Sequence, residues 1–150
     1  MNKVCVIAGV GPGNGASLSR RFSAEDYTVV MLARNQDYLD SLSREIPGSI
    51  PMVCDVREPD AIKAVFSQIH DRAGSVDTLV YNAGSGQWTS IMETSVEGMH
   101  SSWTTNTLGL LVCAQQVIPG MSERDEGNIM VIGATASLRG GAQSTAFASA

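Results

Sequence analysis

The stretch Val4-Cys5-Val6-Ile7-Ala8-Gly9-Val10-Gly11-Pro12-Gly13-Asn14-Gly15 joins an apolar run to a turn in which four of seven residues are glycine. The apolar run predicts a buried strand over residues 3–8, and the pattern after the glycines predicts a helix over residues 14–24. Glycine has no Cβ atom, so the backbone can turn tightly and approach a pyrophosphate closely. The free N–H groups at the start of the helix also favour an anion. The sequence therefore predicts a phosphate-binding turn here.

Composition indicates one ordinary globular domain. The chain has 150 residues, of which 43% are hydrophobic and 17% are charged, which suits a folded domain with a core of its own. The net charge of −5 argues against a nucleic-acid partner, because phosphate neutralisation needs clustered Lys and Arg. Apolar runs are far shorter than the roughly 20 residues that span a bilayer. The first run leads into Gly-Pro-Gly instead of a cleavage site, so we interpret it as a strand and not as a secretion signal.

The cysteines point to a reducing compartment. Cys5, Cys54 and Cys113 each lie in an apolar run, and their spacing is not that of metal ligands. An odd number of cysteines in buried elements indicates reduced core thiols. We therefore expect a cytoplasmic protein without a metal site.

Strand and helix patterns alternate along the whole chain. Further apolar runs predict strands over residues 27–33, 50–54, 76–81 and 127–133, separated by helices over residues 36–45, about 58–74, and, in two parts, up to about 121. Such alternation predicts an α/β fold, a doubly wound parallel sheet of about five strands with helices on both faces. Ligands bind these sheets at the carboxyl ends of the strands.

The second strand ends at Ala33-Arg34, and Arg34 lies 19 positions after Gly15. In dinucleotide-binding folds a carboxylate here binds the ribose 2′-hydroxyl, while an arginine accommodates a 2′-phosphate. Arg34 therefore favours NADP(H) over NAD(H). Two alternatives stay open: Arg34 as a surface arginine, and Asp37 as the ribose partner in an NAD site.

The next two strands also end in residues suited to a cofactor. Asp55-Val56 follows the third strand, where the carboxylate can accept a hydrogen bond from an adenine amino group or simply cap a turn. Asn82-Ala83-Gly84 follows the fourth strand. The small residues leave room for a flat ligand, and the Asn82 amide can bind nearby backbone and fix the turn.

Together these motifs resemble those of the short-chain dehydrogenase/reductase family. Residues 8–15 match its TGxxxGxG pattern with alanine in first place, residues 82–84 match its NAG motif, and Asn106 occupies the position of its catalytic asparagine. The resemblance covers residues 3–150 and implies a Rossmann-type dinucleotide-binding domain over residues 1–150. The cofactor-binding residues it implies are Gly9, Gly11, Pro12, Gly13, Asn14, Gly15, Arg34, Asp55, Val56, Asn82, Ala83 and Gly84.

The catalytic end departs from the family pattern. Phe147 occupies the position of the family's proton-transferring tyrosine, and Ala134 that of its serine, 13 residues earlier. A phenyl ring has no ionisable proton and cannot act as a general acid or base. Possible replacements are Thr135, Ser144, Thr145, His100 or a bound water, with Ser137 as an alternative serine.

The leading hypothesis is an NADP(H)-dependent oxidoreductase acting on a carbonyl or alcohol substrate. The alternative is a non-catalytic NADP(H)-binding protein that acts as a sensor or partner subunit. A third interpretation, a nucleotide-binding domain without redox function, has less support. A P-loop is excluded, because no Gly-Lys-Ser/Thr follows the glycines of this chain.

The resemblance also implies a larger assembly. Family members continue through further helices and strands, so we expect the 150 residues to belong to a longer protein with its fifth strand as an exposed edge. A homo-oligomer, dimer or tetramer, is expected through the helix over residues 106–121. In the opposing interpretation Leu108, Leu111 and Val112 face the sheet instead.

Overall fold

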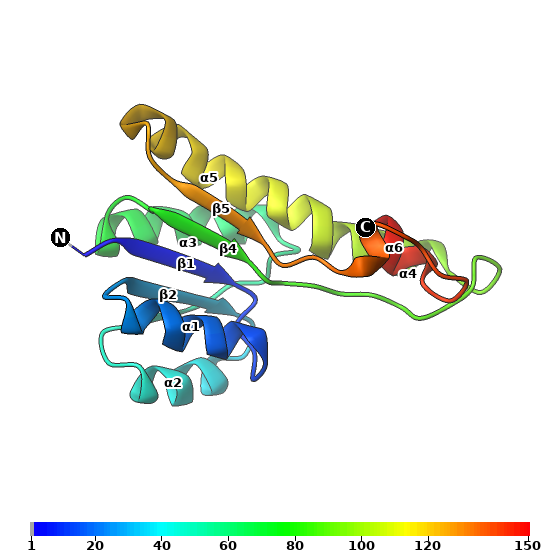
Figure 1. Cartoon of the computed structure of the whole chain (residues 1–150), viewed down its shortest axis with the longest axis horizontal. Helices are drawn as coiled ribbons and strands as arrows, with labels where there is room; N and C mark the ends of the chain where they lie inside the picture. Colours follow the sequence, from blue (N-terminus) through cyan, green and yellow to red (C-terminus); the bar gives the residue numbers. More distant parts are fainter. Residues whose placement is uncertain (1) are drawn as a thin grey trace.

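Within residues 2–150, which the computed structural model describes, five strands form one parallel sheet in the order β3-β2-β1-β4-β5 (Figure 1). The strands are β1 (Val4–Ala8), β2 (Thr28–Ala33), β3 (Ile50–Val53), β4 (Thr78–Tyr81) and β5 (Asn128–Val131). In the register of the sheet, Val6 of β1 lies between Val30 of β2 and Leu79 of β4. The strand order reverses at β1, so the switch point lies between β1 and β4, where ligands bind such sheets. The predicted Rossmann-type fold is confirmed.

Helices cover both faces of the sheet. These helices are α1 (Asn14–Ala24), α2 (Gln36–Glu45), α3 (Pro59–Ala73) and α5 (Gly109–Arg124), whereas α4 (Val96–Trp103) and α6 (Thr145–Ser149) lie beyond the strands (Figure 1). Alternate side chains of β1 point to opposite faces: Val4, Val6 and Ala8 pack with α3 and α5, while Cys5 and Ile7 pack with α1 and α2. Burial on both faces explains why β1 is a continuous apolar run without alternation.

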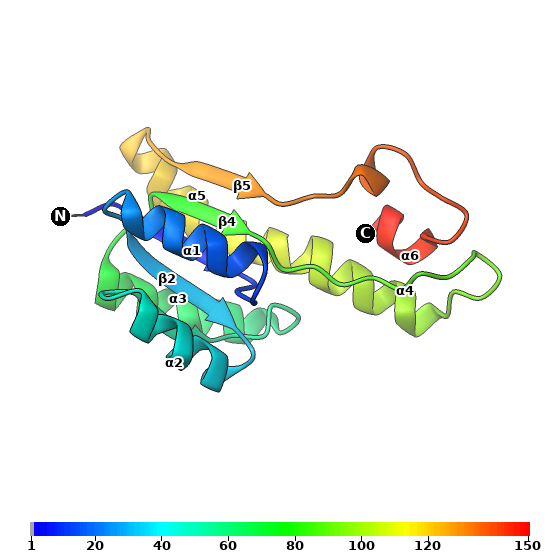
Figure 2. The ribbon, with the colours of Figure 1, turned by 60° about the horizontal axis from the view of Figure 1, so that its bottom comes forward.

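The long helical segment has two α-helical parts joined by a π-helical turn at Thr104–Leu108. Tyr81 at the end of β4 donates its hydroxyl to the Thr105 carbonyl. Gly109 lies so close to the Tyr81 hydroxyl that a Cβ atom would collide with it. Figures 1 and 2 show α4 beyond the carboxyl ends of the strands, beside α6, which it contacts. The predicted two-part helix is therefore confirmed.

Several strands are shorter than expected because sheet pairing is shorter than the apolar runs. β4 begins at Thr78 instead of 76, where its register with β1 starts at Cys5. β5 covers Asn128–Val131 instead of 127–133, matching the length of β4. β2 and β3 are each one residue shorter than predicted. Helix α2 begins as predicted, since the Asn35 side chain accepts a hydrogen bond from the Tyr38 N–H at 3.0 Å.

Apolar side chains are exposed on β5 and on α5. Strand β5 is at the edge of the sheet, as expected, and all four of its residues are exposed. On α5, Val112 is buried but Leu111 is 51% exposed, and Leu108, at the end of the π-helical turn, packs against the core. The interpretation that Leu111 faces the sheet is wrong, because neighbouring positions on a helix point in different directions. In residues 2–150 no helix is long and apolar enough to cross a membrane.

Candidate dinucleotide-binding site

The glycine turn is held tightly against the ends of two strands. Gly9 has a φ of +91°, and a Cβ atom on it would collide with the backbone nitrogen of Ala83. A Cβ atom on Gly15 would lie 2.7 Å from the Val10 Cα. The N–H groups of Gly9 and Val10 both donate to the Leu32 carbonyl at 2.9 Å. Glycine is thus required at positions 9 and 15 by packing of the protein on itself.

The other two glycines face open space. A Cβ atom on Gly11 or Gly13 would have no neighbour within 4 Å. Gly13 is also the N-cap of α1, and no side chain caps this helix. The first N–H groups of α1 are therefore free of a side-chain acceptor, in the arrangement that binds a phosphate.

Asn82 connects β4 to the glycine turn. Its side-chain Nδ2 donates to the Gly9 carbonyl at 2.7 Å, and its backbone N–H donates to the Ala8 carbonyl at 2.9 Å. With Ala83 packed against Gly9, these bonds fix the distance between the ends of β1 and β4. The expected role of Asn82 in fixing the turn matches this geometry.

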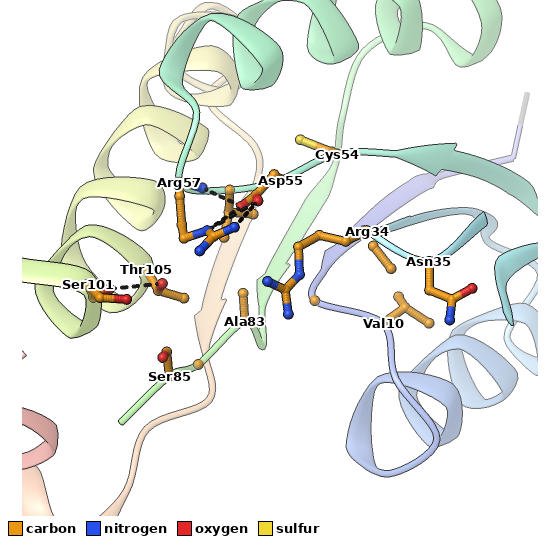
Figure 3. A pocket seen from close by; sticks show the side chains of 14 residues that line it. Val10, Arg34, Asn35, Cys54, Asp55, Arg57, Ala83, Ser85, Ser101 and Thr105 are labelled. Atoms are coloured by element: carbon orange, nitrogen blue, oxygen red, sulfur yellow. Dashed lines mark hydrogen bonds and ion pairs between the residues drawn. The ribbon is translucent and has the colours of Figure 1, made fainter. Parts of the chain in front are cut away.

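A pocket of about 720 Å³ opens beside this turn, at the carboxyl ends of β1 to β4 (Figure 3). Its lining residues are Gly9, Val10, Ala33, Arg34, Asn35, Cys54, Asp55, Val56, Arg57, Ala83, Gly84, Ser85, Ser101 and Thr105. Six of the predicted cofactor residues line it: Gly9, Arg34, Asp55, Val56, Ala83 and Gly84. The remaining predicted residues, Gly11, Pro12, Gly13, Asn14, Gly15 and Asn82, belong to the turn, the start of α1 and the end of β4.

Arg34 and Asp37 are placed differently with respect to this pocket. The Arg34 side chain extends from the end of β2 into the pocket (Figure 3). Asp37 is exposed in the first turn of α2 and does not contribute to the lining. The carboxylate considered for an NAD site is therefore not in the pocket, whereas the guanidinium considered for an NADP site is.

Asp55 is paired with an arginine that sequence reasoning missed. Arg57 donates from Nε to both carboxylate oxygens at 3.0 and 3.1 Å, and from Nη2 to Oδ2 at 2.6 Å. The side-chain hydrogen bond from Arg57 is the main cause that lowers the pKa of Asp55, and the charge of Arg34 also contributes. The sequence shows an arginine two positions after a strand-end aspartate, but this spacing alone does not establish that the two side chains pair.

Asn106 lies in the π-helical turn and is bonded to the loop that follows β4. Its Oδ1 accepts from the Ser85 N–H and its Nδ2 donates to the Ser85 carbonyl, both at 2.8 Å. π-Turns of this kind occur often at functional sites. The Asn106 side chain thus positions Ser85, which lines the pocket, and its catalytic role stays a prediction.

Phe147 lies outside the pocket, in an aromatic contact. Its ring is 4.9 Å from the Trp88 ring, centre to centre, and a Cβ atom on Gly86 would lie 2.5 Å from its Cδ2. Ala134 is exposed after β5. The Ser144 hydroxyl is engaged with the backbone of Gly141.

The Ser137 hydroxyl donates to the Ala134 carbonyl at 2.6 Å. Like Ser137, the other candidate replacements, His100, Thr135 and Thr145, are absent from the pocket lining.

The sequence profile described as short chain dehydrogenase matches residues 3–150. The chain belongs to the short-chain dehydrogenase family. It is 27% identical to carbonyl reductase family member 4 of Xenopus laevis over 140 residues, 93% of this chain and 59% of the relative. It is 31% identical to the NADP-dependent 3-hydroxy acid dehydrogenase YdfG of Shigella flexneri, over 89% of this chain and 54% of that protein.

Solved structures of the family superpose closely. The F189W actinorhodin polyketide ketoreductase with NADPH has a TM-score of 0.94 at 28% identity, covering 99% of this chain and 59% of that one. The closed form of serine dehydrogenase complexed with NADP+ has a TM-score of 0.91 at 29% identity, covering 97% and 60%. This short-chain dehydrogenase chain therefore spans about three fifths of the length of the relatives it matches.

The residues of this short-chain dehydrogenase fit a dinucleotide. Gly11 and Gly13 leave space of the kind that a close-lying pyrophosphate needs, and the N–H groups at the start of α1 have no side-chain acceptor of their own. Arg34 and Asp55 supply opposite charges at the far strands of the pocket. Among the described residues, no cluster of three or more His, Cys, Asp or Glu could hold a metal ion.

Proposed function

We propose that the chain is the cofactor-binding part of an NADP(H)-dependent oxidoreductase that acts on a carbonyl or alcohol substrate. The observation that carries the NADP(H) assignment is the Arg34 guanidinium in the pocket, next to Ala33, where an NAD site would have a carboxylate. An arginine forms charge-assisted, bidentate hydrogen bonds with a phosphate. Each such bond stabilises a complex by about 1.5–3 kcal/mol, so Arg34 would favour NADP(H) by about tenfold or more.

Each part of the cofactor has a matching set of residues. The turn over residues 9–15 and the start of α1 would hold the pyrophosphate, and Arg34 the 2′-phosphate. Asp55 and Val56 would contact the adenine, and residues 82–84 would lie behind the nicotinamide. When bound, the nicotinamide supplies or accepts the hydride. The protein's own task is to orient the ring and substrate and to exchange a proton with the substrate oxygen.

The group that transfers the proton differs from that of the family pattern, because the Phe147 side chain has no ionisable proton. Asn106 holds Ser85 at the pocket wall and orders this end of the site. A threonine or serine hydroxyl, or a water held there, would have to transfer the proton. Similarity to a carbonyl reductase family member and to a 3-hydroxy acid dehydrogenase supports a carbonyl or alcohol substrate.

A non-catalytic NADP(H)-binding protein, acting as a sensor or partner subunit, is the second candidate. Neither expected catalytic position carries a hydroxyl, because the residues there are Ala134 and Phe147. Phe147 packs against Trp88 and Gly86, and Ala134 is exposed. The binding residues at β1 to β4 are unaffected by these replacements. Loss of chemistry with retention of binding is consistent with this arrangement.

We also propose that the protein is cytoplasmic and forms a homo-oligomer. The three cysteines are buried and free, which supports a cytoplasmic location. Leu111 and Ile118 on α5 are exposed apolar residues seven positions apart, on one helical face. They support a homo-oligomer, a dimer or tetramer, formed through this helix.

NADPH consumption separates the two candidates. The chain is mixed with NADPH and a panel of ketones, aldehydes and 3-oxo esters, and absorbance of the reduced cofactor is followed. The oxidoreductase proposal predicts saturable turnover with at least one carbonyl compound. NADPH binding without turnover on any of them would support the non-catalytic protein, and absence of NADPH binding would contradict both.

A further inference from the structure

Arg57 is a charged residue of the pocket lining that makes no contact in the proposed binding of the cofactor. It lies on the loop between β3 and α3, and its guanidinium is spread across both oxygens of Asp55 at 2.6 to 3.1 Å. The Arg57 side chain is 43% exposed and that of Asp55 25% exposed. The pair therefore faces the pocket, where a cofactor would meet it (Figure 3).

The turn does not depend on the Arg57 side chain. The Arg57 backbone N–H donates to Asp55 Oδ1 at 3.0 Å, and the Glu58 N–H donates to the Asp55 carbonyl at 3.1 Å. Both bonds come from backbone and would persist if the side chain were removed. The guanidinium thus adds a charge partner for Asp55 to a loop that is already closed.

The positive charge of Arg57 changes how Asp55 affects an anion in the pocket. Arg34, Asp55 and Arg57 line the same pocket. An unpaired Asp55 carboxylate would repel an incoming 2′-phosphate and compete with it for Arg34, since like charges in a partly enclosed site interact strongly. With Arg57 bound to Asp55, the pair is neutral and the charge of Arg34 is left for the phosphate.

We propose that Arg57 is a specificity-determining residue, which favours a 2′-phosphorylated dinucleotide by neutralising Asp55 beside Arg34. The inference rests on the proposed function, because it assumes that NADP(H) binds in this pocket. Arg57 acts through Asp55 as a positioning residue and takes no part in hydride or proton transfer. Its effect is on the ratio of affinities for the two cofactors.

Isothermal titration of NADPH and NADH into the chain tests this. The measured quantity is Kd for NADH divided by Kd for NADPH, in which effects common to both cofactors cancel. Arg57→Ala should lower the ratio by about tenfold, and R57K should keep most of it because the positive charge remains. The double variant Asp55→Asn/Arg57→Ala removes both charges of the pair and should return the ratio to within about threefold of the wild type.

Arg72→Ala is the matched control, because it removes the same charge from the exposed last turn of α3, which precedes the start of β4 and is not part of the pocket lining. It should leave the ratio unchanged. A thermal melt of each variant without cofactor checks folding, and titration with 2′-phospho-AMP and AMP repeats the comparison without the nicotinamide half.

A wild-type preference for NADPH that Arg57→Ala leaves intact would overturn the inference while sustaining the proposed function. An Arg57→Ala loss that the double variant fails to reverse would also overturn it. A wild type without any preference would instead contradict the NADP(H) assignment itself.

Discussion

Gly9 has a backbone conformation and a neighbour that only glycine tolerates. Its φ of +91° is strained for any residue with a side chain, and Ala83 occupies the place of a Cβ atom. Gly11, two positions later, has neither restriction. The same turn therefore contains glycines that packing requires, such as Gly9, and glycines that leave space for a ligand, such as Gly11.

A pair of alanine substitutions separates these two roles. Gly9→Ala should lower the free energy of unfolding by about 2–4 kcal/mol, from backbone strain and overpacking. Gly11→Ala should change stability by less than about 1 kcal/mol yet weaken NADPH binding, because its Cβ would enter the space left for the phosphates. Urea denaturation and calorimetric titration measure the two effects. Equal loss of stability in both variants would refute the distinction.

Ala134 and Phe147 occupy the expected catalytic positions. The double substitution Ala134→Ser/Phe147→Tyr returns both hydroxyls, and a positioned general acid contributes about 10²–10⁴-fold to rate. We expect NADPH-dependent carbonyl reduction to rise by at least about tenfold. Phe147→Leu is the control, since it changes the packing against Trp88 without adding a proton donor. No gain in a double variant that still binds NADPH would show that this position does not act in proton transfer.

The site residues that the sequence brought together correctly are those whose positions depend on the backbone. Gly9, Asn82 and Ala83 lie together because the spacing of strand ends in a parallel sheet brings them there. Arg57 was missed because its importance depends on a contact with Asp55, and a side-chain contact across a loop has no periodic signal.

The π-helical turn at Thr104–Leu108 joins the helix after β4 to the pocket. Asn106 makes two hydrogen bonds with the backbone of Ser85, and Tyr81 donates to the carbonyl of Thr105. The loop after β4 and the long helix are thus held together by polar contacts. Apolar periodicity predicted the two α-helical parts but not the π-turn, which follows from these local bonds.

Asn106→Ala should remove both bonds to Ser85. The half-buried Ser85 N–H and carbonyl would lose their partners, so we expect a loss of about 1–3 kcal/mol in the free energy of unfolding. NADPH binding should weaken as well, because Ser85 lines the pocket. Gln115→Ala, an exposed position on α5, is the control for helix propensity in urea denaturation. Unchanged stability in Asn106→Ala would contradict the linking role.

The strand bounds show where patterns fail at this scale. The apolar run before Tyr81 begins at 76, but pairing with β1 begins only at Thr78. Hydrophobicity reports burial, whereas strand length is set by the partner, which a local pattern does not contain. The outward position of Leu111 has the same origin, because its exposure depends on how α5 packs.

Two apolar clusters, one on each face of the sheet, bury the three cysteines of the chain. Burial raises the pKa of Cys5 and Cys113 to about 12 and that of Cys54 to about 11. A raised pKa leaves little thiolate at pH 8, and the thiolate is the reactive form. The sequence predicted these layers from the alternation of strands and helices and from the continuous apolar runs of β1 and β2. Such runs are typical of strands buried on both faces, as these two are.

The native chain should therefore react slowly with Ellman's reagent at pH 8. All three cysteines should react rapidly once urea unfolds the protein, since exposure returns their pKa to its ordinary range. The slow rate of the native chain should rise with pH between 7 and 9, because the thiolate fraction increases with pH below the raised pKa of each thiol. Fast labelling of a native cysteine would contradict the buried arrangement.

The whole pocket depends on one claim, that it binds NADP(H) with Arg34 on the 2′-phosphate. Calorimetric titration of NADPH and NADH into the wild type and into Arg34→Asp measures this directly. We predict that the wild type binds NADPH at least about tenfold more tightly, and that the substitution reverses the preference by repelling the phosphate. Equal affinity of the wild type for both cofactors would contradict it.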